Sequence, residues 1–231
     1  MSARYQVFHD THYRYDSPVS LAQQLAHLWP RACAWQLCSE RQLLISPDPT
    51  SRRDEQDVFG NPLTRLAFER PHDELLVNAQ LSVEVLERPA LDFAASLPWD
   101  AARGALTYSG QPLSEALLEA CRYRFESPYV HLKQSFVEFC ASCFVPGRPL
   151  LQGAQALMEK IFSEFTFDAE ATQVATPLVE VLERRRGVCQ DFAHLMLACL
   201  RSRGLAARYV SGYLLTLSLI HISEPTRRRG I

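Results

Sequence analysis

The segment from residue 185 to residue 200 is where the sequence most clearly suggests chemistry, because Cys189 lies two positions after Gly187 and precedes a helical apolar pattern. The spacing predicts a helix that begins at about Cys189 and ends before Gly204. A cysteine in a first turn faces unpaired backbone N–H groups and the positive end of the helix dipole, both of which favour thiolate over thiol. Cys189 is therefore a candidate nucleophile. The alternative is a small buried residue at a helix start, since most free cysteines are inert.

Two titratable residues close to Cys189 are weaker candidates. His194 is five positions further on, and at about 100° per residue this places it roughly 140° around the helix, away from the thiol. We expect it to be a packed, hydrogen-bonded histidine. Asp191 is expected to be a first-turn carboxylate that complements the helix dipole, with a direct role in the site as the alternative.

The first ninety residues have the pattern of β-strands. Residues 77–85 alternate between apolar and polar side chains, and similar short runs occur at 5–9, 43–46 and 63–69, with a turn expected at 59–62. This predicts an N-terminal antiparallel β domain over residues 1–90.

Helical spacing replaces this pattern after Ser114. We predict a helical connector over residues 91–150, with one apolar stripe at 117, 118, 121 and 125 and another at 136, 137, 140 and 144. Residues 154, 157, 158, 161, 162 and 165 form the clearest amphipathic pattern. A short helix should start with Thr176 as N-cap and Pro177 as its first residue, and residues 207–216 have the pattern of a strand.

The last fifteen residues, 217–231, continue none of these patterns and end in three arginines followed by Gly-Ile. They resemble the translated read-through of a sequencing adapter, and a native basic tail is the alternative. We therefore expect residues 1–216 to be the native part of a truncated gene product.

The amino-acid composition limits the classes of binding partner that we expect. With 24 basic and 26 acidic residues and a formal charge of −2, the chain offers no basic field for many phosphate contacts, so neither nucleic acid nor acidic lipid is an expected partner.

No apolar run reaches the roughly 18 residues of a membrane helix, and the first residues lack the apolar core of a signal peptide. Seven cysteines without regular spacing argue against a disulfide framework. A cytoplasmic protein is expected.

Other combinations of reactive residues are weaker. Cys140 and Cys143 form a Cys-x-x-Cys pair, but on a helical apolar stripe, which favours buried thiols over a metal or redox site. Cys33 and Cys38 form a looser pair, and a four-cysteine site built from both pairs is the remote alternative. The histidines at 9, 12 and 72 are taken as surface or structural. No metal and no cofactor are expected.

The residues around Cys189 resemble a known family. Residues 187–194, Gly-Val-Cys-Gln-Asp-Phe-Ala-His, followed by 201–205 and 207–213, are similar to the core of bacterial transglutaminase-like proteins. Residues 13–19, 57–61 and 69–72 resemble the N-terminal β region that precedes this core. The resemblance covers nearly all of residues 1–216. It implies an α+β fold: the N-terminal β domain, the helical connector, and over residues 151–216 an incomplete papain-like core.

The resemblance also implies a papain-like Cys-His-Asp site, in which Cys189 matches the nucleophile. It would attack a carboxamide or peptide carbonyl of a peptide or protein substrate and form a thioester, which water or an amine would then resolve. In such proteins the histidine stands in a His-Ala-Trp-like segment beyond the strand that ends near Tyr213, and the aspartate lies further on. This sequence reaches neither, and His221, inside the unusual tail, is not assigned.

We therefore expect the intact gene product to be an enzyme, with hydrolysis favoured over cross-linking, and this chain to be inactive. The alternative is a non-catalytic peptide-binding or interaction module on the same fold.

Overall fold

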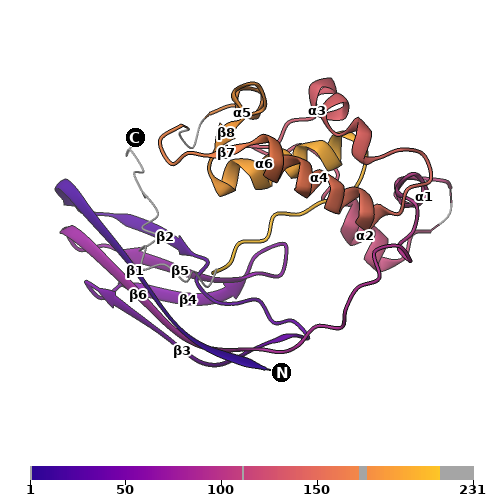
Figure 1. Ribbon diagram of the computed structural model, residues 1–231. Coiled ribbons are helices and arrows are strands. Elements are labelled where there is room, and N and C mark those ends of the chain that lie inside the picture. Colours follow the sequence, from indigo (N-terminus) through magenta and orange to yellow (C-terminus); the bar gives the residue numbers. More distant parts are fainter. Residues whose placement is uncertain (1, 111, 172–175, 214–231) are drawn as a thin grey trace. The chain divides into compact units, whose positions relative to one another are not determined.

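The computed structural model describes residues 2–110, 112–171 and 176–213 (Figure 1). The chain divides into two units, Met1–Ala90 and Leu91–Ile231. The N-terminal unit is made of antiparallel sheets and the second unit is mainly helical, so the chain has a mixed α+β fold, as the sequence predicts.

Six strands form the N-terminal unit: β1 (Ala3–Val19), β2 (Ala22–Ala26), β3 (Gln36–Ser46), β4 (Ser51–Gln56), β5 (Pro62–Phe68) and β6 (His72–Val85). They make two three-stranded sheets with the orders β1-β6-β3 and β2-β5-β4 (Figure 1). The alternation predicted for residues 77–85 is confirmed, because the odd positions from 75 to 83 in β6 are buried and the even positions between them are not. This buried face packs with Leu66 and Phe68 of β5 in one apolar core.

The turn predicted at 59–62 joins β4 to β5. The Asp57 carboxylate accepts hydrogen bonds from the backbone N–H groups of Phe59 and Asn61, each at 2.8 Å. Gly60 has a φ of 74°, which a residue with a side chain rarely adopts. Hydrogen bonds from Asn61 hold the pKa of Asp57 below its usual value.

The second unit contains α1 (Trp99–Ala105), α2 (Glu115–Cys121), α3 (Gln134–Phe139), the 3₁₀ turn η1 (Ala141–Cys143), α4 (Leu150–Glu164), β7 (Thr166–Phe167), α5 (Leu178–Arg184), β8 (Arg186–Gly187) and α6 (Cys189–Ser202). Its core is formed mainly by one side of α3, α4, α5 and α6. Leu157, Leu195 and Cys199 have no exposed surface. Within the described residues, no helix combines the length and the apolar character that a bilayer crossing requires.

Two predicted apolar stripes are only partly correct. On α4, Leu157 and Ile161 are buried, as is Phe165 directly after the helix, but Met158 and Phe162 are exposed by 55% and 88%. The packed face of this helix is thus narrower than its apolar pattern. In α2 no residue is buried, and the helix ends at Cys121, before Phe125, which is 68% exposed.

Two further expectations, on the start of α5 and on a strand after α6, differ from the structure. The helix expected to start at Pro177 starts at Leu178, with Pro177 as its N-cap. The strand expected over residues 207–216 is not formed by its described part, 207–213. There the Ala207 N–H donates to the Tyr123 carbonyl at 3.1 Å, and no described strand lies alongside to continue a ladder. Residues 214–216, like the tail at 217–231, lie outside the described residues.

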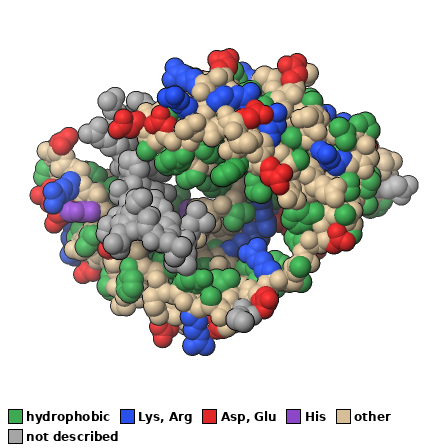
Figure 2. Space-filling model, viewed as in Figure 1, with side chains coloured by type: hydrophobic (Ala, Val, Ile, Leu, Met, Phe, Trp, Pro, Cys, Tyr) green, Lys and Arg blue, Asp and Glu red, His purple; other side chains and the backbone are tan. Residues whose placement is uncertain are grey.

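Acidic and basic side chains are interspersed on the face shown in Figure 2. This distribution agrees with the small formal charge of −2.

Candidate active site

Cys189 is the first residue of α6, and its side chain is exposed. The helix start predicted from sequence is therefore confirmed, but the alternative of a small buried residue at this position is wrong. The same helix buries Leu195, Ala198 and Cys199 further along. The thiol thus lies at the accessible end of a helix whose body is fixed in the core.

A short parallel ladder holds the chain immediately before Cys189. Thr166 of β7 pairs with Arg186 of β8, and Phe167 pairs with Gly187. Two flanking bonds extend this ladder, from the Thr166 N–H to the Arg185 carbonyl at 2.9 Å and from the Asp168 N–H to the Gly187 carbonyl at 3.0 Å. The ladder fixes the backbone two residues before the thiol.

Arg185 makes the turn from α5 into this ladder. It has a φ of 55°, in the left-handed region that a residue with a side chain seldom adopts. Its guanidinium lies 4.7 Å from the ring centre of Phe139 and 4.9 Å from that of Phe165, and it forms an ion pair with Glu164 at 3.3 Å. Phe165 in turn packs edge-on against Phe192 of α6. These contacts connect the α5–α6 turn to the end of α4.

Asp191 caps the start of α6. Its Oδ2 accepts a hydrogen bond from the Val188 N–H at 2.8 Å, and the residue is only 9% exposed. Gly187 leaves the space for this carboxylate, because a Cβ at Gly187 would lie 2.7 Å from Asp191 Oδ2. The expected structural role of Asp191 at the first turn is therefore confirmed, and it takes the form of a specific hydrogen bond as well as a favourable charge.

His194 is packed between tyrosines, as expected of a structural histidine. Its ring stacks on Tyr129 with centroids 5.6 Å apart and lies 5.2 Å from the ring of Tyr209. Burial lowers the pKa of His194, the charge of Asp191 acts in the opposite direction, and that of Arg201 lowers the pKa further. His194 is thus part of the packing around α6, and its pKa lies below the usual value.

Arg201 is a buried cation near the end of α6, only 7% exposed. Its guanidinium donates to the carbonyl oxygens of Ala207 at 2.9 Å and Phe125 at 3.0 Å, and to the Ser127 hydroxyl at 3.2 Å. Burial lowers the pKa of Arg201. The side chain ties the loop at 125–127 and the segment after α6 to the helix that carries Cys189.

The other thiols of the second unit's core lie apart from this exposed end. Cys140 and Cys143 are buried, as predicted, and the Cys140 thiol donates to the backbone carbonyls of Val137 at 3.6 Å and of Cys199 in α6 at 3.9 Å. Donation from the Cys199 thiol lowers the pKa of Cys140, and the same interaction raises the pKa of Cys199. Cys33 and Cys38, in the N-terminal unit, are exposed. Among the described residues, no group of three His, Cys, Asp or Glu side chains is arranged to hold a metal ion.

The sequence missed the parts of this site that depend on contacts between distant residues. Nothing in the local sequence around Arg185 indicates its position between two phenylalanines. Arg201 had no predicted role. A basic residue amid the apolar positions of a buried helix was the available signal, because a cation there requires acceptors from other segments.

The fold and the Cys189 helix define a class of protein, since residues 138–222 match the transglutaminase-like superfamily. Residues 5–84 match the bacterial transglutaminase-like N-terminal region, so the chain belongs to the bacterial transglutaminase-like proteins.

Uncharacterized mycobacterial proteins are similar over most of the chain. One from Mycobacterium tuberculosis is 37% identical over 216 residues, which cover 92% of this chain and 66% of the relative. One from Mycobacterium leprae is 29% identical over 212 residues, or 91% of this chain and 71% of the relative. The chain therefore spans about two thirds of the length of the curated relatives it matches.

A solved structure shares the fold. The crystal structure of a candidate cysteine protease from Cytophaga hutchinsonii aligns with a TM-score of 0.66 at 16% identity, over 89% of this chain and 67% of that chain. This likeness supports the papain-like assignment of the fold.

Proposed function

We propose that Cys189 is the nucleophile of thiol-based acyl chemistry on the amide bonds of peptides or proteins. The observation that carries the proposal is the position of this thiol, exposed at the first residue of α6 while the helix behind it is buried. The family match of residues 138–222 supports the same class of reaction.

In the proposed reaction the Cys189 thiolate attacks the amide carbonyl carbon. The C–N bond breaks, the nitrogen leaves with a proton as ammonia or an amine, and the acyl group remains as a thioester. Water or a second amine then attacks the thioester, and the thiolate is regenerated. The first four N–H groups of a helix have no intrahelical partner, so those of the first turn of α6 are suited to stabilise the oxyanion.

The proton-transfer partners are proposed to come from outside the described residues. Of the two described histidines in the second unit, His194 is held between tyrosines, and His131 lies 3.9 Å from Glu126 in an exposed ion pair. With these two histidines engaged in other contacts, the start of α6 is what remains among the described residues to favour the thiolate, and a helix terminus alone contributes only about 0.3–1 kcal/mol at exposed sites. We therefore expect no turnover of amide substrates by this chain alone.

Alkylation of the full chain tests the nucleophile. With iodoacetamide between about pH 6 and 9, peptide mapping should show Cys189 modified faster than Cys33 and Cys38 at the acidic end of the range. Those two cysteines are the matched controls because they are also exposed but do not begin a helix. Equal rates at all three positions would refute an activated thiolate and favour the non-catalytic binding module.

Turnover requires a second measurement on a gene product that carries the proposed histidine and aspartate. It should release ammonia or amine from a glutamine-containing or peptide substrate, and Cys189→Ser should abolish the release. Unchanged release by Cys189→Ser would exclude Cys189 as the nucleophile.

A further inference from the structure

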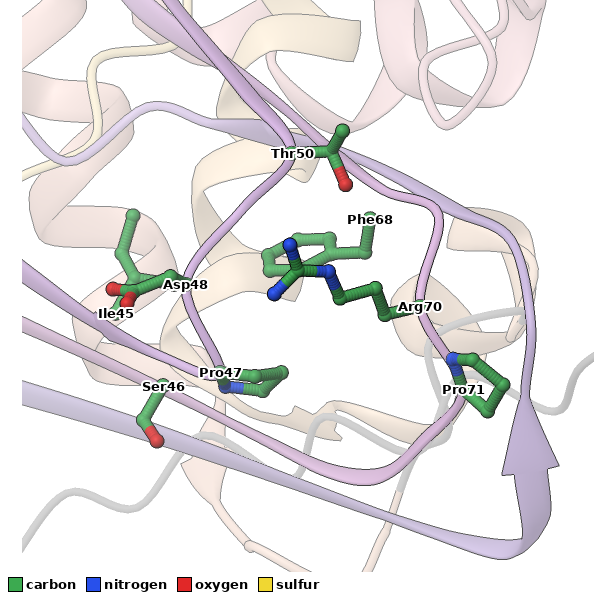
Figure 3. Close-up of a pocket in the computed structure, with 8 residues that line it drawn as sticks. All are labelled: Ile45, Ser46, Pro47, Asp48, Thr50, Phe68, Arg70 and Pro71. Carbon is green, nitrogen blue, oxygen red and sulfur yellow. The ribbon is translucent and has the colours of Figure 1, made fainter.

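A hollow of about 430 Å³ lies in the N-terminal unit, between the segments 45–50 and 68–71 (Figure 3). The first segment leads from β3 to β4 and the second from β5 to β6, so both connect one sheet to the other. The volume falls within the range of small-ligand sites, roughly 300–1,000 Å³. Neither the family match nor the chemistry of Cys189 gives this hollow a role.

Arg70 supplies the positive charge of the hollow. Figure 3 shows its side chain extended between the two segments, toward the 45–50 segment. The guanidinium forms no hydrogen bond or ion pair with any residue in the described part of the chain, and only the Arg70 backbone carbonyl is engaged, by His72. A guanidinium whose donors are not taken by the described residues is suited to bind carboxylate in a bidentate manner.

Thr50 adds a second donor from the opposite segment. Its Oγ1 accepts a hydrogen bond from the Glu69 N–H at 3.0 Å and is directed toward the hollow in Figure 3. Because a hydroxyl both accepts and donates, this contact leaves the Thr50 O–H to be donated to a ligand. Two donors from different segments therefore converge on the space.

The remaining walls combine apolar side chains with Ser46 and Asp48. Phe68 is only 2% exposed, and Pro47 and Pro71 lie on either side. Asp48 also lines the hollow, but Figure 3 shows its carboxylate turned away from the Arg70 guanidinium. A negative charge at this edge disfavours ligands with two or more negative charges, such as phosphate.

We propose that this hollow binds a single carboxylate carried on an apolar body. The carboxylate takes the donors of Arg70 and Thr50, and the apolar group packs mainly on Pro47 and Pro71. A free N-acylated amino acid and the C-terminal residue of a peptide share this chemistry. The proposal is independent of the reaction assigned to Cys189.

Calorimetric titration of the full chain with N-acetyl-leucine tests the proposal. We expect binding in the millimolar range or tighter, and no binding of N-acetyl-leucine amide, which lacks the charge. A tripeptide ending in leucine distinguishes the two sources, since binding at least tenfold tighter than that of N-acetyl-leucine assigns the site to peptide C-termini. Equal affinity assigns it to free carboxylic acids.

Variants locate the binding. Arg70→Gln should weaken it by about tenfold or more, because a charge-assisted pair is lost, and Arg70→Lys should weaken it less. Arg53→Gln, an exposed position on β4 that does not line the hollow, is the matched control and should bind like the unmodified protein. Cys189→Ser should also bind normally, which separates this result from the fate of the catalytic proposal. No millimolar binding, equal binding of the amide or of inorganic phosphate, or equal effects of Arg70→Gln and Arg53→Gln would overturn the proposal.

Discussion

Gly187→Ala tests whether the contact between Gly187 and Asp191 sets the start of the Cys189 helix. An added Cβ would lie 2.7 Å from Asp191 Oδ2, closer than such atoms approach in proteins, and 3.1 Å from Asp191 Cβ, which is a tight contact. The carboxylate cannot rotate away without losing its 2.8 Å hydrogen bond from the Val188 N–H. Either the backbone before Cys189 shifts or the cap is broken.

Both responses should lower the free energy of unfolding by a similar amount. Overpacking of a well-packed position typically costs about 1–3 kcal/mol. Removal of a hydrogen bond to a charged group costs about 1.5–3 kcal/mol. Since the two responses are alternatives, we expect Gly187→Ala to lower the free energy of unfolding of the second unit by about 2 kcal/mol, roughly a 30-fold change in equilibrium.

A double-mutant cycle in urea unfolding provides the assay. Asp191→Ala removes the clashing carboxylate, so Gly187→Ala should have little further effect in that background. Gly104→Ala in α1 is the matched control, because nothing lies within 4 Å of its added Cβ. That change should be neutral or should stabilise by up to about 1 kcal/mol. Equal effects of Gly187→Ala with and without Asp191 would refute the reasoning.

Two further predictions concern the packing of α6 and α4. Because burial lowers the pKa of His194, the unfolded chain binds this proton at a higher pH than the folded chain, so stability should fall as the pH drops below about 6.5. His194→Gln should flatten this part of the pH profile of the urea midpoint, and an unchanged slope would contradict the assignment. Leu157→Ala, at a position with no exposed surface, should destabilise by about 2–5 kcal/mol in the same assay. Met158→Ala, one residue further and 55% exposed, should change stability by less than about 1 kcal/mol, and equal losses would place both side chains in the core.

The elements that the sequence predicted well are those whose periodicity reflects one buried face. The alternation in β6 and the start of α6 at Cys189 are of this kind. β4 was missed because its residues, Ser-Arg-Arg-Asp-Glu-Gln, are polar and mostly exposed, so no periodicity marks it. Met158 and Phe162 of α4 show the opposite error, because apolar spacing identifies a helix but cannot show how much of its apolar surface finds a partner.

The candidate site also has features that could be predicted from sequence and features that could not. The position of Cys189 at a helix start could be predicted because a helix start is a local property of the sequence. The position of Arg185 between Phe139 and Phe165 could not, since it brings together residues separated by 20 to 46 positions in the chain. Contacts of this kind depend on the tertiary fold and leave no periodic signal.

The arrangement of α6 explains how one helix can combine an accessible thiol with a rigid support. Cys189 is exposed at its first residue, whereas Cys199, ten residues later, is fully buried and hydrogen-bonded to Cys140. Between them, Asp191 fixes the first turn, and beyond them Arg201 anchors the loops at the other end. The fold therefore constrains the helix along its length while leaving the thiol itself accessible. Substitution of Cys189 can for this reason alter reactivity without disturbing the packing that positions it.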